Sequence, residues 1–185
     1  MRSHEAIPGW FNFSRAYSDA VDLAKPGARF VEVGCWAGRS AVFLAEQILT
    51  SRKNITLHCV DHWKGSPEHK DNPELADIYE TFMRNTERLR KEMGERFVVI
   101  RDDSARAAKC FTDESLDFVW LDAGHDYKSV AKDIKAWLPK IRQGGVLGGD
   151  DYPMEGVRKA VDEAFPRARR ISENGWTTWW HDVRN

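Results

Sequence analysis

The chain has 185 residues, a length typical of one compact domain. Hydrophobic residues make up 42% of it and charged residues 31%, which excludes a disordered or low-complexity protein. The formal net charge of −1 excludes a strongly basic nucleic-acid binder, and no apolar run reaches the roughly 18 residues that a membrane span needs.

Cysteine usage and the first residues indicate the compartment. Three widely spaced cysteines, Cys35, Cys59 and Cys110, match neither a zinc pattern nor a disulfide framework. The first residues lack the apolar stretch of a signal peptide. We therefore expect a cytoplasmic protein that binds a small molecule and has neither a membrane nor a nucleic acid as partner.

The first half of the chain alternates short apolar runs with helical patterns. Residues 1–27 are expected to form a helical segment on the substrate side. In chain order we then expect strand 28–33, helix 40–49, strand 55–60, helix 74–93, strand 97–100 and short helix 104–111. The long helix is amphipathic, because its apolar residues recur at helical spacing.

The second half repeats this rhythm. In chain order we expect strand 116–121, helix 130–141, strand 146–150, helix 155–164 and strands 168–172 and 176–183. Gly144-Gly145 is expected to end the first of these helices. Asn174-Gly175 lies between the last two strands and is a strong hairpin signal.

Strands that alternate with helices predict right-handed βαβ crossovers and a parallel sheet covered on both faces. The terminal hairpin adds an antiparallel strand near one edge. We therefore predict a single α/β domain over residues 1–185, with a doubly wound, mainly parallel, seven-stranded sheet. Ligands of such sheets bind beyond the carboxyl ends of the strands, where the strand order reverses.

The first predicted strand ends in a glycine-containing turn, Glu32-Val33-Gly34-Cys35-Trp36-Ala37-Gly38-Arg39-Ser40. Gly34 and Gly38 permit a tight turn and close approach of a ligand, and the next helix directs its free N–H groups into that turn. Glu32 needs a hydrogen-bonding or cationic partner, such as an amino-acid ammonium group. The spacing differs from G-x-G-x-x-G, which argues against a nicotinamide oxidoreductase. A tight turn without any ligand is the alternative.

Polar residues also follow the next two strands. Asp61 comes after the second strand, where a carboxylate can accept hydrogen bonds from ribose hydroxyls. Asp103 and Ser104 come after the third strand, within reach of an adenine edge. The alternatives are a surface aspartate in a turn for Asp61 and a helix cap for Ser104.

Three carboxylates converge from the fourth and fifth strand ends. Asp122 follows one strand, and Asp150 and Asp151 follow the other. Unpaired, these groups would repel and raise one another's pKa, and a hard divalent cation such as Mg²⁺ would relieve that conflict. The alternative is that basic residues such as Lys128 or Arg158 pair with them.

These motifs resemble the class I S-adenosylmethionine-dependent methyltransferases over about residues 28–183. The Glu-x-Gly-x-x-x-Gly turn resembles that of the small cation-dependent O-methyltransferases of the catechol and caffeoyl-coenzyme A type. The segment from Leu121 to Tyr152 is similar to the macrocin-type sugar O-methyltransferases.

The resemblance implies roles for individual residues. The methionine part and ribose of S-adenosylmethionine would be surrounded by Glu32, Gly34, Trp36, Gly38 and Ser40. Further cofactor contacts would come from Asp61, His62, Trp63, Asp103, Ser104 and Asp122. The ligands of a divalent cation, with Mg²⁺ as the expected ion, would be Asp122, Asp150 and Asp151.

Two departures from the catechol-type pattern bear on the chemistry. His125 stands where those enzymes carry the general-base lysine, and a histidine accepts a hydroxyl proton near neutral pH without a large pKa shift. Asp122 and a water on the metal are alternative bases. Asp150-Asp151 stands where the catechol-type enzymes have Asp-Asn, as in the sugar-modifying relatives, which weakens the case for a catechol.

We therefore predict an enzyme that methylates a small-molecule hydroxyl, in a vicinal diol, a sugar or a catechol-like compound, with the help of a divalent cation. Two alternatives stay open: a metal-independent methyltransferase, and a non-catalytic protein that binds S-adenosylmethionine or another nucleotide. The sequence fixes neither the acceptor nor the oligomeric state, for which a homodimer is one candidate.

Overall fold

The computed structural model describes residues 4–65 and 76–183 and contains one seven-stranded sheet in the order β3-β2-β1-β4-β5-β7-β6. Its strands are β1 (Arg29–Val33), β2 (Thr56–Asp61), β3 (Phe97–Arg101), β4 (Leu116–Leu121), β5 (Ile141–Gly149), β6 (Arg169–Glu173) and β7 (Trp176–Asp182). The α-helices are α1 (Ser14–Leu23), α2 (Arg39–Ser51), α3 (Ile78–Met93), α4 (Ser104–Ala107), α5 (Tyr127–Trp137) and α6 (Glu155–Ala164). Single 3₁₀ turns are formed by His4–Ala6, Gly94–Arg96, Ala108–Cys110 and Leu138–Lys140.

The predicted doubly wound sheet is confirmed. Strands β1 to β5 pair in parallel, whereas β7 is antiparallel to both β5 and β6. Asn174 and Gly175 both have positive φ, 50° and 80°, in a two-residue hairpin turn. Positive φ at both positions matches the turn to the right-handed twist of its strands.

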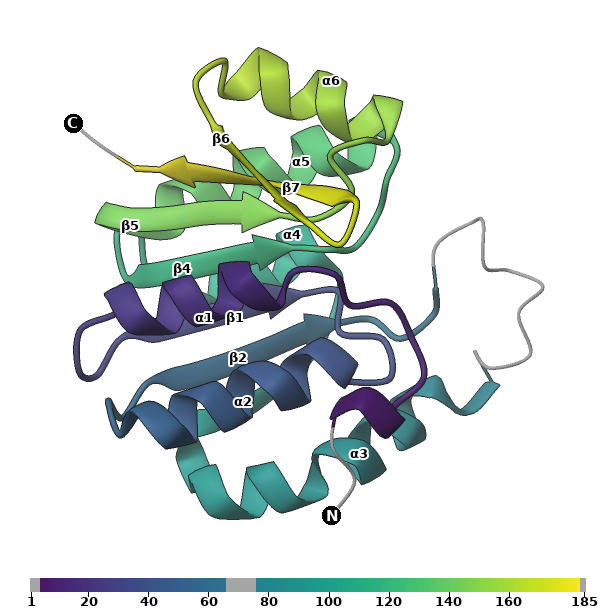
Figure 1. Cartoon of the computed structure of the whole chain (residues 1–185), viewed down its shortest axis with the longest axis vertical. Helices are drawn as coiled ribbons and strands as arrows, with labels where there is room; N and C mark the ends of the chain where they lie inside the picture. The colour runs from purple at the N-terminus through teal and green to yellow at the C-terminus, as the bar shows by residue number, and fades with distance from the viewer. Residues whose placement is uncertain (1–3, 66–75, 184–185) are drawn as a thin grey trace.

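Helices cover both faces of the sheet (Figure 1). Helices α1 and α2 lie on one face with α3 beside α2, and α4, α5 and α6 lie on the other. Side chains alternate between the two layers, as strand geometry requires. Phe30 packs in the α1–α2 layer and Val31 in the α5–α6 layer, and in β7 Trp180 and Trp179 divide in the same way.

The predicted boundary between the fifth helix and its strand is wrong. Helix α5 ends at Trp137, a 3₁₀ turn containing Pro139 follows, and β5 already begins at Ile141. Gly144-Gly145 lies inside β5, where the register with β4 shifts. The two glycines therefore form an irregularity within the strand and do not end the helix, because Ile141 already pairs with Leu116 of β4.

Two other helices differ from the predicted ranges. Helix α3 starts at Ile78, and residues 74–75 of the predicted helix lie outside the described residues. The predicted short helix at 104–111 is divided into α4 and a 3₁₀ turn. Within the described ranges, no helix is long and apolar enough to cross a membrane.

The strand order reverses between the neighbouring strands β1 and β4, and their carboxyl ends approach closely. The Gly34 N–H donates to the Val60 carbonyl (2.9 Å), and the Asp122 N–H donates to the Val33 carbonyl (2.8 Å). Gly34 has φ +90°, and a Cβ on it would lie 1.8 Å from the Asp122 carbonyl oxygen. The close contact between the turn after β1 and the backbone after β4 therefore requires glycine at position 34.

Replacing Gly34 by alanine is expected to destabilise the fold by at least about 3 kcal/mol, because the new methyl group overlaps the β4 backbone. Gly27→Ala is the matched control, since Gly27 also has positive φ (+79°) but no atom within 4 Å of an added Cβ. It should cost about 1 to 2 kcal/mol. Urea unfolding measures both, and equal losses would contradict the overlap.

Candidate active site

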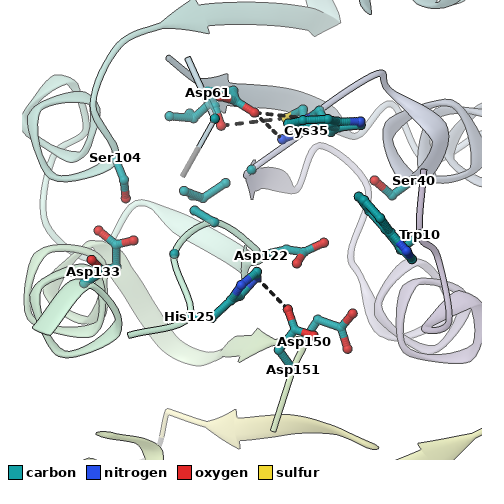
Figure 2. Close-up of a pocket in the computed structure, with 18 of the residues that line it drawn as sticks. Trp10, Cys35, Ser40, Asp61, Ser104, Asp122, His125, Asp133, Asp150 and Asp151 are labelled. Atoms are coloured by element: carbon teal, nitrogen blue, oxygen red, sulfur yellow. Dashed lines mark hydrogen bonds and ion pairs between the residues drawn. The ribbon is translucent and has the colours of Figure 1, made fainter. Parts of the chain in front are cut away.

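A cavity of about 590 Å³ opens at the carboxyl ends of the parallel strands, a volume typical of a small-molecule site. Its wall is rich in aspartate: Asp61, Asp102, Asp103, Asp122, Asp126, Asp133, Asp150 and Asp151. Arg39 and Lys132 are the arginine and lysine among the described residues that line it. Figure 2 shows Trp10 at one side of this cavity and Ser104 with Asp133 at the opposite side. The excess of carboxylates favours a positively charged occupant.

The glycine-containing turn is held by Asp61. Its Oδ2 accepts the backbone N–H groups of Cys35 (2.9 Å) and Trp36 (3.1 Å), and its Oδ1 accepts that of Trp63 (2.6 Å). Figure 2 shows Asp61 beside Cys35 on the cavity wall. Asp61 thus orders the turn of β1 from the end of β2, and its contact with ribose hydroxyls stays a prediction.

Most residues expected at the cofactor line this cavity: Gly34, Trp36, Ser40, Asp61, His62, Asp103, Ser104 and Asp122. Of the expected set, Glu32, Gly38 and Trp63 lie behind the wall. Gly38 shapes the backbone with φ +89°. Trp63 is 4% exposed, and its side chain packs on Tyr79 and Phe82. Its indole N–H donates to the Trp36 carbonyl (2.9 Å), which holds the ring in the core. Of the two side chains expected to pack on adenine, His62 is therefore the one on the wall.

Glu32 is fully buried beneath α1 and accepts the hydroxyl of Tyr17 at Oε1 (2.9 Å), while its Oε2 has no hydrogen-bond partner. Burial raises its pKa to about 7, against the opposing effect of the Ser40 and Tyr17 hydroxyls. Ser40 lies on the cavity wall, so it links this carboxylate to the cavity. Tyr17 is a partner that sequence reasoning missed, since it lies on a different element and no local pattern marks it.

Three carboxylates and one imidazole gather at the ends of β4 and β5 (Figure 2). Oxygens of Asp122 and Asp151 and a nitrogen of His125 all lie within 4.8 Å of one another. Asp150 is 8% exposed, and its Oδ1 has no hydrogen-bond partner. Burial and the two neighbouring carboxylates raise the pKa of Asp122 well above its usual range, and burial together with Asp151 raises that of Asp150 to about 7.

His125 lies in the loop between β4 and α5, and its Nε2 is 2.8 Å from Asp151 Oδ2. Asp151 itself has the left-handed φ of +56°, a backbone conformation that is costly for a residue with a side chain. In this conformation the Asp151 carboxylate lies against the His125 imidazole. The structure brings the predicted base together with two of the three predicted cation ligands, Asp122 and Asp151, whereas Asp150 is not a member of this group.

The opposite side of the cavity is formed by α4 and α5. Asp103 caps α4 by accepting the Arg106 N–H (3.2 Å), and it also pairs with Lys132 (3.1 Å). Ser104 Oγ accepts the indole N–H of Trp137 (2.9 Å). Asp133 is 7% exposed, and burial raises its pKa to about 6, opposed by the Ser104 hydroxyl.

Asp133 lines the cavity but was not predicted as a site residue, although the sequence contains a signal for it. It lies on the otherwise apolar face of α5, between Val130 and Trp137, which are both buried. A charged residue at a core position of an amphipathic helix needs a functional or structural reason. Its position on the cavity wall supplies one.

The raised pKa values predict that the free energy of unfolding falls with pH. Folded Glu32 and Asp150 titrate near pH 7, whereas unfolded carboxyls titrate near about pH 4, so the folded state binds more protons between these values. Their contribution is therefore lost as pH rises from about 4 to 7. The measurement is urea unfolding of the wild type, Glu32→Gln and Asp150→Asn from about pH 5 to pH 8 in the presence of a chelator. In each variant the free energy of unfolding should decrease over this range by about 2 kcal/mol less than in the wild type. Variants with the wild-type pH dependence would contradict this.

Comparison with known proteins places this site in a family. A family model described as a methyltransferase domain matches residues 31–152. The O-methyltransferase NovP is 19% identical with a TM-score of 0.67, over 92% of this chain and 79% of that chain. CalS11, a TDP-rhamnose 3'-O-methyltransferase of calicheamicin biosynthesis, is 13% identical with a TM-score of 0.62, over 91% and 76%. A Clostridium thermocellum protein, provisionally described as an rRNA-methylase, is 11% identical with a TM-score of 0.68, over 97% and 99%.

At these identities the structural likenesses show the fold, and the family match carries the assignment. It spans the glycine-containing turn, Asp61 and all three carboxylates at the ends of β4 and β5. The predicted family is therefore confirmed: the chain belongs to the methyltransferase domain family and is a class I S-adenosylmethionine-dependent methyltransferase.

Proposed function

We propose that this methyltransferase acts on a hydroxyl of a small molecule that carries two adjacent oxygens, and that a divalent cation assists the transfer. Sugars and other vicinal diols are the favoured acceptors, with catechols as a third class. The observation that carries the proposal is the group formed by Asp122, His125 and Asp151, together with the buried Asp150 Oδ1 that has no hydrogen-bond partner. The names of NovP and CalS11 as O-methyltransferases support the same reaction class.

The three carboxylates fit a divalent cation. Asp150 Oδ1 is buried without a partner, and burial and mutual repulsion raise the pKa values of Asp122 and Asp150. A buried carboxylate oxygen that lacks a hydrogen bond is costly, and oxygen coordination removes that cost. Mg²⁺ accepts oxygen ligands of this kind and keeps several waters, so Asp122, Asp150 and Asp151 would hold it while leaving room for an acceptor.

S-adenosylmethionine would supply an activated methyl group as the electrophile, and a divalent cation held by Asp122, Asp150 and Asp151 would polarise the acceptor hydroxyls. The residues of the chain bring the reactants together. The turn held by Asp61 orders one wall of the cavity, and Trp36 and Ser40 lie on that wall. Alignment of this kind contributes much of the rate in a transfer between two bound molecules.

His125 is the proposed general base, with Asp122 as the alternative. The contact between His125 Nε2 and Asp151 orients the imidazole at the cavity wall, where it accepts the proton that leaves the acceptor hydroxyl. Asp122 is less suited as the base, because it is one of the carboxylates that would hold the cation.

The charge of the cavity favours a neutral acceptor over a polyanion. Eight aspartates within the described part of the chain line the cavity, and they would repel a nucleic-acid backbone. The cavity is also lined by Trp10, Asn12, Met154 and Trp176, and Trp10 is 70% exposed. Apolar and amide side chains of this kind suit a neutral ring that carries hydroxyls. We therefore propose a small-molecule acceptor even though one structural neighbour is provisionally described as an rRNA-methylase.

Transfer of labelled methyl groups to a panel of sugars, vicinal diols and catechols tests the function. Turnover is expected with Mg²⁺ and is expected to be lost in excess chelator. Asp150→Ala should lower metal-dependent turnover at least about 100-fold, because it removes one cation ligand, while S-adenosylhomocysteine affinity stays within a few-fold. Undiminished turnover of this variant, or of the wild type in chelator, would favour the metal-independent alternative.

His125→Asn is expected to lower kcat about 100-fold or more if His125 removes the proton. The affinities for S-adenosylhomocysteine and for Mn²⁺, measured by calorimetry and electron paramagnetic resonance, should change little, since neither depends on the base. A wild-type kcat in His125→Asn would contradict this role and would favour Asp122 as the general base.

A further inference from the structure

The side of the cavity formed by α4 and α5 contains a buried carboxylate that the proposed transfer does not use. Asp133 lines the cavity at 7% exposure, and it lies beside Ser104 on the side opposite Trp10 (Figure 2). Lys132, the preceding residue in the chain, pairs with Asp103 instead. A carboxylate removed from water in this way needs hydrogen-bond donors on its oxygens.

Ser104 satisfies only part of that need. Its Oγ accepts the indole N–H of Trp137 at 2.9 Å, so the hydroxyl proton is available to Asp133, and the Ser104 hydroxyl does lower the Asp133 pKa. A carboxylate has about four acceptor positions. One hydroxyl therefore leaves acceptor capacity on a rigid side chain at the cavity wall.

The rest of the cavity determines which donor would meet Asp133. Asp61 lies at the end of β2, where ribose hydroxyls are expected, and the methyl-accepting side lies at Asp122, Asp150 and Asp151 (Figure 2). The base of a nucleoside held between these groups extends away from the methyl group, toward α4 and α5. The exocyclic amine of adenine is the strongest donor on that base, and it matches a carboxylate acceptor.

We propose that Asp133 recognises adenine by accepting its exocyclic amine, with Ser104 as the positioning residue that orients the carboxylate. Asp103, the residue expected there from the sequence, is instead committed to the α4 N-terminus and to Lys132. The proposal depends on binding of S-adenosylmethionine in this cavity and not on the cation or the acceptor.

The test compares two ligands that differ at the amine-bearing edge of the base. S-inosylhomocysteine carries a carbonyl oxygen where S-adenosylhomocysteine carries the amine, and an N–H where the adenine has the N1 acceptor. At the position of the amine it therefore presents an acceptor to the Asp133 carboxylate. Calorimetry should show the wild type binding S-adenosylhomocysteine at least about tenfold more tightly than the inosine analogue. Equal affinities in the wild type would overturn the proposal, and this comparison does not require any variant to fold.

Asp133→Asn tests the residue itself. The amide oxygen still accepts from Ser104, while the amide N–H₂ donates to a carbonyl, so the preference should shrink about tenfold or reverse. Two control variants should keep the wild-type ratio of the two affinities. They are Asp103→Asn and Asp113→Asn, and Asp113 is an exposed residue that pairs with Lys140. The proposal fails if Asp103→Asn moves the ratio instead, or if Asp133→Asn weakens both ligands equally. Loss of all binding in the wild type would overturn the cofactor assignment itself.

Discussion

The convergence of carboxylates at one edge of the sheet is the constraint on which the site depends. Parallel strands bring their carboxyl ends to the same edge, so Asp122 at the end of β4 meets Asp150 and Asp151 at the end of β5. Burial makes their mutual repulsion costly, and the raised pKa values of Asp122 and Asp150 record that cost. Under the proposed function, a cation and a positively charged cofactor would stabilise this arrangement on binding.

The supporting structure keeps these charges in place without neutralising them. Gly34 allows the turn after β1 to pack directly on the backbone after β4. Asp61, at the end of β2, accepts a backbone hydrogen bond from this turn. Helix α1 contributes Tyr17, which donates to buried Glu32 at 2.9 Å. The hydroxyls around Glu32 supply hydrogen bonds and no positive charge. The cavity therefore keeps its negative potential for its ligands.

Much of the fold could be predicted because its signals are local. Apolar runs, helical spacing and Asn174-Gly175 indicated the strands, helices and hairpin, and the strand ends indicated where the cavity opens. The start of β5 could not be predicted, since its first residues pair with β4 only through a register shift. The pairs Tyr17–Glu32 and His125–Asp151 depend on tertiary contacts between separate elements. Trp63 was expected at the cofactor, but core packing against Tyr79 and Phe82 determines its position.

Direct titration of the protein with Mn²⁺ in the presence of S-adenosylhomocysteine tests the central claim, that the carboxylates at the ends of β4 and β5 hold a divalent cation. Electron paramagnetic resonance of free Mn²⁺ reports binding without any acceptor or turnover. The account predicts one bound ion per chain, displaced by Mg²⁺ and lost in a variant that carries Asp150→Ala and Asp151→Ala together. Binding of S-adenosylhomocysteine with no bound ion would contradict it and would leave a methyltransferase that works without a metal.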